Sequence, residues 1–118
     1  MNTFDSIHGF LPAILQKLES LQPDKVILFG SYADGTALPD SDLDLLLVLD
    51  SDLIPQTYAE KQANYLKAAR VLRDIRQQMS IDLLVHTRAT FARMFESDSQ
   101  FANRIREKGI ILYEKQHT

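Results

Sequence analysis

The sequence contains no cysteine among its 118 residues, and only four glycines and four prolines. The lack of cysteine excludes a disulfide scaffold, a cysteine-based zinc site and thiol catalysis. No apolar run is long enough for a membrane span, and the first residues lack the apolar run of a secretion signal. We therefore expect a cytoplasmic protein that has no membrane partner.

Concentrated positive charge is also missing. The chain has 13 Lys and Arg residues against 16 Asp and Glu residues, a formal net charge of −3, and its basic residues are dispersed. A protein that grips a polynucleotide backbone needs a basic surface, so we expect no direct polynucleotide binding. A chain of 118 residues that is 45% hydrophobic can build one compact core but not two ordinary domains. Residues 1–118 are therefore expected to form a single domain.

Short apolar runs alternate along the chain with stretches of helical periodicity. Strands are predicted at 25–29, 42–49, 80–87 and 110–113, and helices at 7–21 with a break near residue 10, 57–79, 88–95 and 98–108. The helix at 57–79 should be the longest, with Tyr58 and Met79 at the ends of its apolar side. Gly109 should close the last helix, and residues 32–41 indicate a loop with room for one helical turn. This alternation predicts an α/β domain with one sheet.

Three aspartates stand out from the predicted strands. Side chains of a strand alternate between faces, so Asp42 and Asp44 should project to the same side. Asp82 lies between Ile81 and Leu83, where a charged side chain has no packing role. If the two strands are neighbours, three carboxylates converge. Such a group favours hard divalent cations, so we expect Mg²⁺, or Mn²⁺ as the alternative, with two ions in the site.

Gly30 and Ser31 follow directly after the first predicted strand. A serine hydroxyl and the backbone N–H groups of such a turn can bind phosphate oxygens, and the absence of Cβ at residue 30 permits close approach. A phosphate-binding turn and a carboxylate cluster would then share one cleft.

These residues resemble a known signature. The stretch GSYADG at 30–35, followed by SDLDL at 41–45, is similar to the signature of the DNA polymerase β-like nucleotidyltransferase superfamily, especially its minimal nucleotidyltransferases. The C-terminal FANRIREKG at 101–109 and LYE at 112–114 also resemble the end of these proteins. The resemblance implies a mixed sheet packed with helices and an NTP substrate, ATP first. It also implies that Gly30 and Ser31 bind nucleotide and that Asp42, Asp44 and Asp82 are catalytic and hold metal.

One residue departs from the pattern of this family. Many relatives carry a basic residue where this chain has Asp34. A cationic contact to the nucleotide or to a partner is therefore missing here, or another residue such as Arg70 or Arg73 supplies it.

The resemblance also implies a biological role. Many minimal nucleotidyltransferases are antitoxins that transfer AMP to a tyrosine of a partner HEPN-domain toxin, and this is the first expectation. Few residues remain after the signature to build an acceptor pocket, which favours an acceptor on another molecule. Two alternatives stay open: a small-molecule transferase like those that modify aminoglycosides, completed by a partner or a dimer mate, and a non-catalytic antitoxin subunit. The oligomeric state is also left open.

Overall fold

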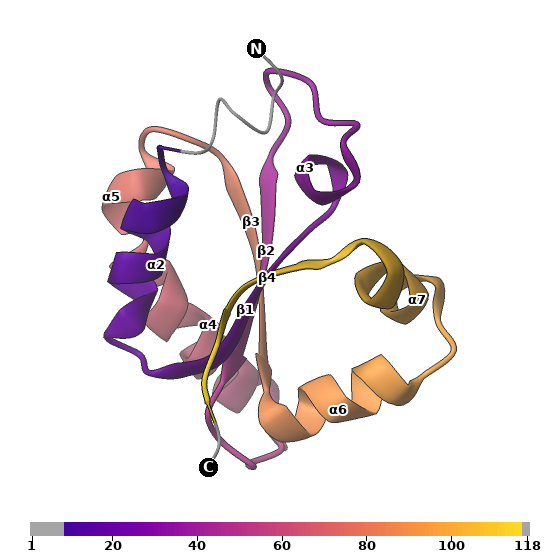
Figure 1. Cartoon of the computed structure of the whole chain (residues 1–118). Helices are drawn as coiled ribbons and strands as arrows, with labels where there is room; N and C mark the ends of the chain where they lie inside the picture. The colour runs from indigo at the N-terminus through magenta and orange to yellow at the C-terminus, as the bar shows by residue number, and fades with distance from the viewer. Residues whose placement is uncertain (1–8, 117–118) are drawn as a thin grey trace.

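The computed structural model describes residues 9–116, which fold into an α/β arrangement of four strands and six helices (Figure 1). Ile7, the first residue of the helix expected at 7–21, lies outside the described residues. In chain order the elements are α2 (Leu11–Glu19), β1 (Pro23–Phe29), α3 (Ser31–Asp34), β2 (Leu43–Leu49), α4 (Tyr58–Val71), α5 (Arg73–Arg76), β3 (Ile81–Thr87), α6 (Arg88–Glu96), α7 (Gln100–Lys108) and β4 (Ile110–Glu114). No helix among residues 9–116 is long and apolar enough to cross a membrane.

The four strands form one mixed sheet in the order β3-β2-β1-β4. β1 pairs with β2 and with β4 in antiparallel fashion, whereas β2 and β3 run parallel. The parallel pair needs a crossover connection, which α4 and α5 provide. β3 and β4 are the edge strands of the sheet, so β2 and β1 lie in its interior. This arrangement confirms the α/β class with a mixed sheet.

Helices cover both faces of the sheet (Figure 1). On one face, α2, α4 and α5 pack against a core that includes Leu28, Leu45 and Leu72. On the other face, α6 and α7 contribute to a smaller cluster that includes Leu46, Phe91 and Ile105. β2 is buried from both sides, which explains its nearly continuous apolar sequence rather than an alternating pattern.

The expected long helix at 57–79 is interrupted. Its first part, α4, begins after Thr57, whose side chain accepts a hydrogen bond from the backbone N–H of Glu60, and ends at Val71. Leu72 leaves helical geometry with φ −95° and ψ 2° while its side chain stays fully buried. The chain then forms the short α5, from which Arg76 donates a hydrogen bond to the carbonyl of Ile81 at 2.9 Å. This bond and the burial of Leu72 turn the chain toward β3.

The ends of two predicted helices also differ from expectation. Tyr58, placed on the apolar side of the long helix, is 78% exposed because it lies at the first position of α4 beyond the core. Gly109 does follow the end of α7, but with φ −62° and ψ 142° it is extended rather than left-handed. Glycine is needed there for a different reason: an added Cβ would lie 2.6 Å from the carbonyl oxygen of Ile105. The predicted helical turn within 32–41 is present as α3.

Candidate functional site

Asp44 and Asp82 lie beside each other on neighbouring strands. They are register partners in the parallel pair of β2 and β3. Strand alternation puts Asp44 on the face that carries Leu46, and Asp82 on the face opposite Leu83, so both project from the α6 and α7 side of the sheet. Asp44 is half-buried, whereas Asp82 is exposed on the edge strand. The two residues occupy an open end of the sheet.

Asp42 precedes β2 by one residue and is exposed. The loop before it is closed by a reciprocal pair of hydrogen bonds, in which the backbone N–H of Leu38 donates to Ser41 Oγ at 2.8 Å and the N–H of Ser41 donates to the carbonyl of Leu38 at 3.0 Å. Ser41 therefore shapes the entry of the chain into β2. After Asp42, the N–H of Leu43 bonds the carbonyl of Ser80 at 2.9 Å, which joins the starts of β2 and β3.

The electrostatics of Asp44 reflect this crowding. Partial burial, the negative charge of Asp82 and the negative charge of Asp42, in that order, raise the pKa of Asp44 from 3.8 to about 6. A group that resists ionisation because of neighbouring anions is stabilised in its charged form by a cation. The local field at Asp44 thus favours a bound positive charge.

The chemistry of the donors fits a hard divalent cation, since carboxylate oxygens are the ligands that Mg²⁺ accepts. Asp44 and Asp82 would hold such an ion between neighbouring strands, with Asp42 as the additional carboxylate. However, no group of three or more acidic or histidine side chains within residues 9–116 is already gathered closely enough to surround a metal ion. The fit therefore rests on the Asp44–Asp82 pair and on the raised pKa of Asp44.

The Gly30–Ser31 turn lies directly against Asp44. Gly30 has φ 73° and ψ −155°, a conformation that favours glycine, and an added Cβ would overlap Oδ2 of Asp44. The carbonyl of Gly30 accepts hydrogen bonds from the N–H groups of Ala33 and Asp34, both at 3.1 Å, which start α3. The structure thus brings the expected phosphate-binding turn and the aspartate of β2 into contact.

Asp34, the departure from the family pattern, is engaged by an arginine that sequence reasoning did not single out. Arg104 Nη2 in α7 lies 2.8 Å from Asp34 Oδ2. Hydrogen bonds from Thr36 and then from Arg104 hold the pKa of Asp34 below its usual value. Arg104 is 70 positions away from Asp34 in the sequence. The only sequence signal for it is that it lies in a predicted helix whose apolar residues fall on one side.

The arginines considered for a compensating cation lie elsewhere. Arg70 in α4 and Arg73 in α5 belong to helices that pack on the leucine-rich face of the sheet, opposite the face of Asp44. We therefore do not retain Arg70 or Arg73 as contacts to a nucleotide at this site. Their position on that face is set by the burial of Ala68 and Leu72 in the core.

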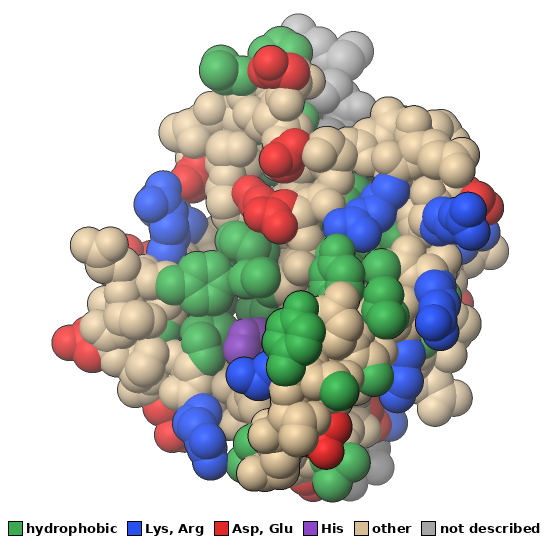
Figure 2. All heavy atoms as spheres, turned by 180° about the vertical axis from the view of Figure 1, so that it is seen from behind, with side chains coloured by type: hydrophobic (Ala, Val, Ile, Leu, Met, Phe, Trp, Pro, Cys, Tyr) green, Lys and Arg blue, Asp and Glu red, His purple; other side chains and the backbone are tan. Residues whose placement is uncertain are grey.

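The surface around the site combines negative charge with apolar side chains. Viewed from behind, the molecule shows a group of acidic side chains bordered by a hydrophobic area (Figure 2). Leu84, two residues after Asp82 on the same side of β3, is 37% exposed. His86 follows at the far end of β3, where it is bonded to Thr90 Oγ1 at 3.0 Å. Burial, and then the charge of Lys61, lower the pKa of His86.

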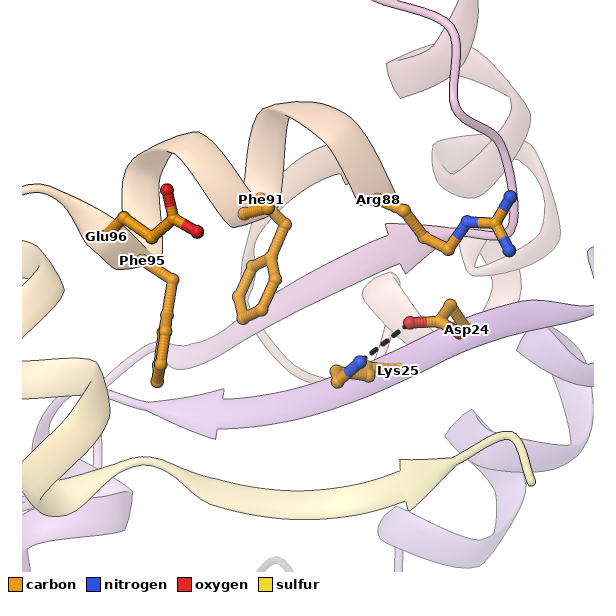
Figure 3. Close-up of a pocket in the computed structure, with 7 residues that line it drawn as sticks. Asp24, Lys25, Arg88, Phe91, Phe95 and Glu96 are labelled. Atoms are coloured by element: carbon orange, nitrogen blue, oxygen red, sulfur yellow. Dashed lines mark hydrogen bonds and ion pairs between the residues drawn. The ribbon is translucent and has the colours of Figure 1, made fainter. Parts of the chain in front are cut away.

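A hollow of about 330 Å³ lies at the opposite end of β1, between α6 and the sheet (Figure 3). Phe91 points from α6 toward Lys25, which is paired with Asp24 at 2.8 Å, and Phe95 stacks beside Phe91. Asp24 and Lys25 lie near the start of β1, whereas Phe29 ends it beside Asp44, so the part of the hollow that β1 lines is about 13 Å or more along the strand from Phe29. It does not belong to the candidate site.

Comparisons with known proteins find solved structures of similar fold. The chain resembles a toxin–antitoxin structure with AMP-PNP (20% identity, 90% of this chain and 74% of that one, TM-score 0.58). It also resembles a nucleotidyltransferase structure from Sulfolobus solfataricus (15% identity, 98% and 90%, TM-score 0.63) and a mutant of the toxin–antitoxin MntA-HpeT (18% identity, 90% and 74%, TM-score 0.56). At these identities the likeness concerns the fold. A search of curated protein sequences finds no match.

The sequence itself places the chain in a family. The model of the nucleotidyltransferase domain matches residues 11–111, which include the Gly30–Ser31 turn and all three aspartates. This match covers most of the chain and the whole of the sheet up to the middle of β4. The protein therefore belongs to the nucleotidyltransferase domain family.

Proposed function

We propose that this protein is a divalent-metal-dependent nucleotidyltransferase that transfers AMP from ATP to a hydroxyl group of a partner protein. The observation that carries the proposal is the contact between the Gly30–Ser31 turn and Asp44, which is itself the register partner of Asp82. A turn suited to phosphate oxygens and carboxylates suited to Mg²⁺ lie against each other. The triphosphate and the metal-binding side chains would therefore share one site.

The reaction follows from this arrangement. An acceptor hydroxyl oxygen forms a bond to the α-phosphorus of ATP, the bond from that phosphorus to the bridging oxygen breaks, and pyrophosphate leaves. The hydroxyl proton passes to a carboxylate oxygen of the site, a role that we assign to Asp82 because it is exposed on the edge strand β3. Bound Mg²⁺ supplies neutralisation of the phosphate charge. Gly30 and Ser31 bind and orient the triphosphate, so positioning and electrostatics provide most of the acceleration.

The acceptor is proposed to arrive on another protein. Asp42 and Asp82 are exposed and β3 is an edge strand, so the site opens to solvent. A docked partner would provide the second wall and exclude water. By the resemblance to minimal nucleotidyltransferases, and in keeping with the toxin–antitoxin structures of similar fold, the partner is a HEPN-domain toxin and the hydroxyl belongs to one of its tyrosines. The protein would then act as an antitoxin.

The test combines the protein with the product of the neighbouring gene, ATP and Mg²⁺, and measures both intact masses. The expected result is an increase of one or more AMP units on the partner. The increase should disappear when Asp44→Asn replaces the native protein and when a chelator removes Mg²⁺. Tandem mass spectrometry then identifies the modified side chain, which we expect to be a tyrosine.

Two other outcomes would replace the proposal. Neutralisation of the partner by Asp44→Asn without any mass change would establish a non-catalytic antitoxin. Absence of partner modification, combined with AMP transfer to an aminoglycoside, would establish a small-molecule transferase. Asp74→Asn serves as the control for loss of one negative charge, because Asp74 lies in α5 on the opposite face of the sheet.

A further inference from the structure

We infer that Arg104 is a positioning residue for the nucleotide: through Asp34, and together with Phe101, it holds the Gly30–Ser31 turn in the form that binds phosphate. The inference rests on the proposed function, since it assigns a binding role to that turn. Arg104 and Phe101 both belong to α7, which follows the turn by some 70 residues. A helix from the far end of the chain would thus complete the site.

Helix α7 contacts the segment on both sides of the turn. Before it, the ring of Phe101 meets the ring of Phe29 edge to face, with the ring centres 5.4 Å apart. After it, Arg104 Nη2 lies 2.8 Å from Asp34 Oδ2 at the end of α3. Phe29 directly precedes Gly30, and Asp34 ends the short helix α3 that begins at Ser31. The two contacts therefore restrain the turn at its entrance and at its exit.

The turn needs such restraint from elsewhere. α3 has only four residues, too few to be stable as an isolated helix. Gly30 lies in a region of backbone space that glycine enters readily, but glycine also leaves it readily. The residues that follow α3, from Gly35 to Asp42, are mostly exposed. Apart from Tyr32, whose side chain is buried in the leucine-rich core, the segment around the turn thus has little local structure to hold it.

The Asp34 carboxylate connects Arg104 to the end of α3 and to the loop that follows it. Its side chain is only 9% exposed, and it accepts hydrogen bonds from Thr36 Oγ1 at 2.6 Å and from the Thr36 N–H at 3.3 Å in addition to the Arg104 bond. Asp34 therefore fixes the end of α3 to the following loop and ties both to α7. The guanidinium also offsets the negative charge of Asp34, which would otherwise lie near a triphosphate.

A direct contact between Arg104 and phosphate is the competing role, and the variant Asp34→Asn separates the two. This change keeps an acceptor for Thr36 but removes the ionic bond to Arg104. If Arg104 positions the turn, affinity for ATP must fall. If Arg104 instead binds phosphate, loss of a nearby anion and release of the guanidinium must raise it.

The experiment measures Mg²⁺-ATP binding by calorimetry for Asp34→Asn, Arg104→Ala and the double variant, and amide hydrogen exchange over residues 30–36 without nucleotide. Each single change should weaken binding about 5-fold, the double variant should bind no more weakly than the singles, and exchange over 30–36 should accelerate in all three. Arg106→Ala is the control. It removes the same charge from the same helix, but Arg106 bonds Asn103 and the carbonyl of Phe95 instead of α3, and its binding should stay within about twofold.

Unchanged or tighter ATP binding by Asp34→Asn would overturn the inference, as would additive losses in the double variant. Melting temperatures of Arg104→Ala and Arg106→Ala establish that any difference in binding does not reflect unfolding. If the native protein binds no ATP, the proposed function fails. The exchange measurement still stands in that case, because equal exchange over 30–36 in native and Arg104→Ala protein would show that α7 does not restrain the turn.

Discussion

Gly30 lies so close to Asp44 that a Cβ on residue 30 would overlap the Oδ2 atom of the aspartate. The two residues face each other where β1 ends and β2 begins, because Phe29 and Asp44 are register partners. The absence of a side chain at residue 30 therefore sets the position of a carboxylate as well as the shape of a turn.

The first prediction concerns this contact. Gly30→Ala should lower ATP affinity by at least about 10-fold, because the methyl group displaces Asp44 and the residue no longer tolerates φ 73°. Calorimetry with Mg²⁺-ATP measures the effect. Gly35→Ala is the matched control, since Gly35 also has a positive φ of 82° but no atom within 4 Å of an added Cβ. It should cost some stability and leave ATP affinity nearly unchanged; equal losses in both variants would reduce the effect at Gly30 to backbone strain.

The second prediction concerns the three aspartates. Asp42→Asn, Asp44→Asn and Asp82→Asn should each lower AMP transfer by at least about 100-fold, by analogy with removal of one electrostatic stabiliser from an active site. Transfer is followed as pyrophosphate release in the presence of the acceptor protein. Asp74→Asn should retain full activity. An aspartate whose replacement leaves the rate intact does not belong to the site.

The third prediction is a pH dependence of stability in the metal-free protein. The pKa of Asp44 is raised to about 6 in the folded state, above its unfolded value. Its charge therefore opposes folding increasingly as the pH rises from about 4 to about 6, with no further change above that window. Asp44→Asn lacks this unfavourable ionisation, so its free energy of unfolding should exceed that of the native protein by about 1 kcal/mol at pH 7. The difference is small because water screens much of the repulsion at this partly exposed residue.

Urea denaturation at pH 4, 5, 6 and 7 with a chelator present measures this difference. The gap between variant and native protein should widen up to pH 6 and then stay constant. Millimolar Mg²⁺ should close it, because a cation relieves the repulsion in the native protein only. A gap that is independent of pH would show that Asp44 is not crowded by its neighbours.

The fourth prediction separates a structural ion-pair network from the site. At the other end of β2, Asp50 pairs with Lys115 and with Arg88, both at 2.6 Å, and so ties the chain after β4 to the start of α6. Asp50→Asn should lower the melting temperature and leave ATP affinity unchanged. A hydrogen bond from Lys115 lowers the pKa of Asp50, so this stabilisation should be lost as the pH falls below the usual range of a carboxyl group. Calorimetric melting curves at pH 3 and pH 7 measure the loss of stability and its pH dependence. Titration calorimetry with Mg²⁺-ATP measures the affinity.

Much of the fold could be predicted because its signals are local. The four strands are short apolar runs that end at turn residues, and the structure places all four within two residues of the expected bounds. Alternation along β2 and β3 agrees with the structure for Asp44 and Asp82, which are register partners, whereas Asp42 precedes β2. The break at Leu72 was missed because Leu72 continues the helical spacing of apolar residues, and only its burial against the sheet and the bond from Arg76 to Ile81 turn the chain there.

The candidate site likewise has a part that the sequence indicates and a part that depends on long-range packing. Gly30, Ser31, Asp42 and Asp44 belong to a compact motif that sequence spacing indicates, and Asp82 stands out as a charged residue in a later apolar strand, although their roles stay predictions. The ion pair of Asp34 with Arg104 could not be predicted, because it joins residues 70 positions apart and depends on how α7 packs across the sheet. Arg70 and Arg73 were considered instead on charge alone, and the leucine-rich face of β2 places them on the wrong side.

The order of the strands has a consequence for synthesis on the ribosome. β1 lies between β2 and β4, and β4, the last strand within residues 9–116, follows α7 directly. The turn after β1 thus leaves the ribosome well before α7, whose Arg104 pairs with Asp34, and before β4, the second neighbour of β1. Until α7 and β4 have been synthesised, a nascent chain has an open edge at β1 and no arginine against Asp34, and at typical elongation rates the roughly 70 residues between Asp34 and Arg104 take several seconds. The capacity to bind nucleotide should therefore arise only after α7 and β4 have emerged from the ribosome.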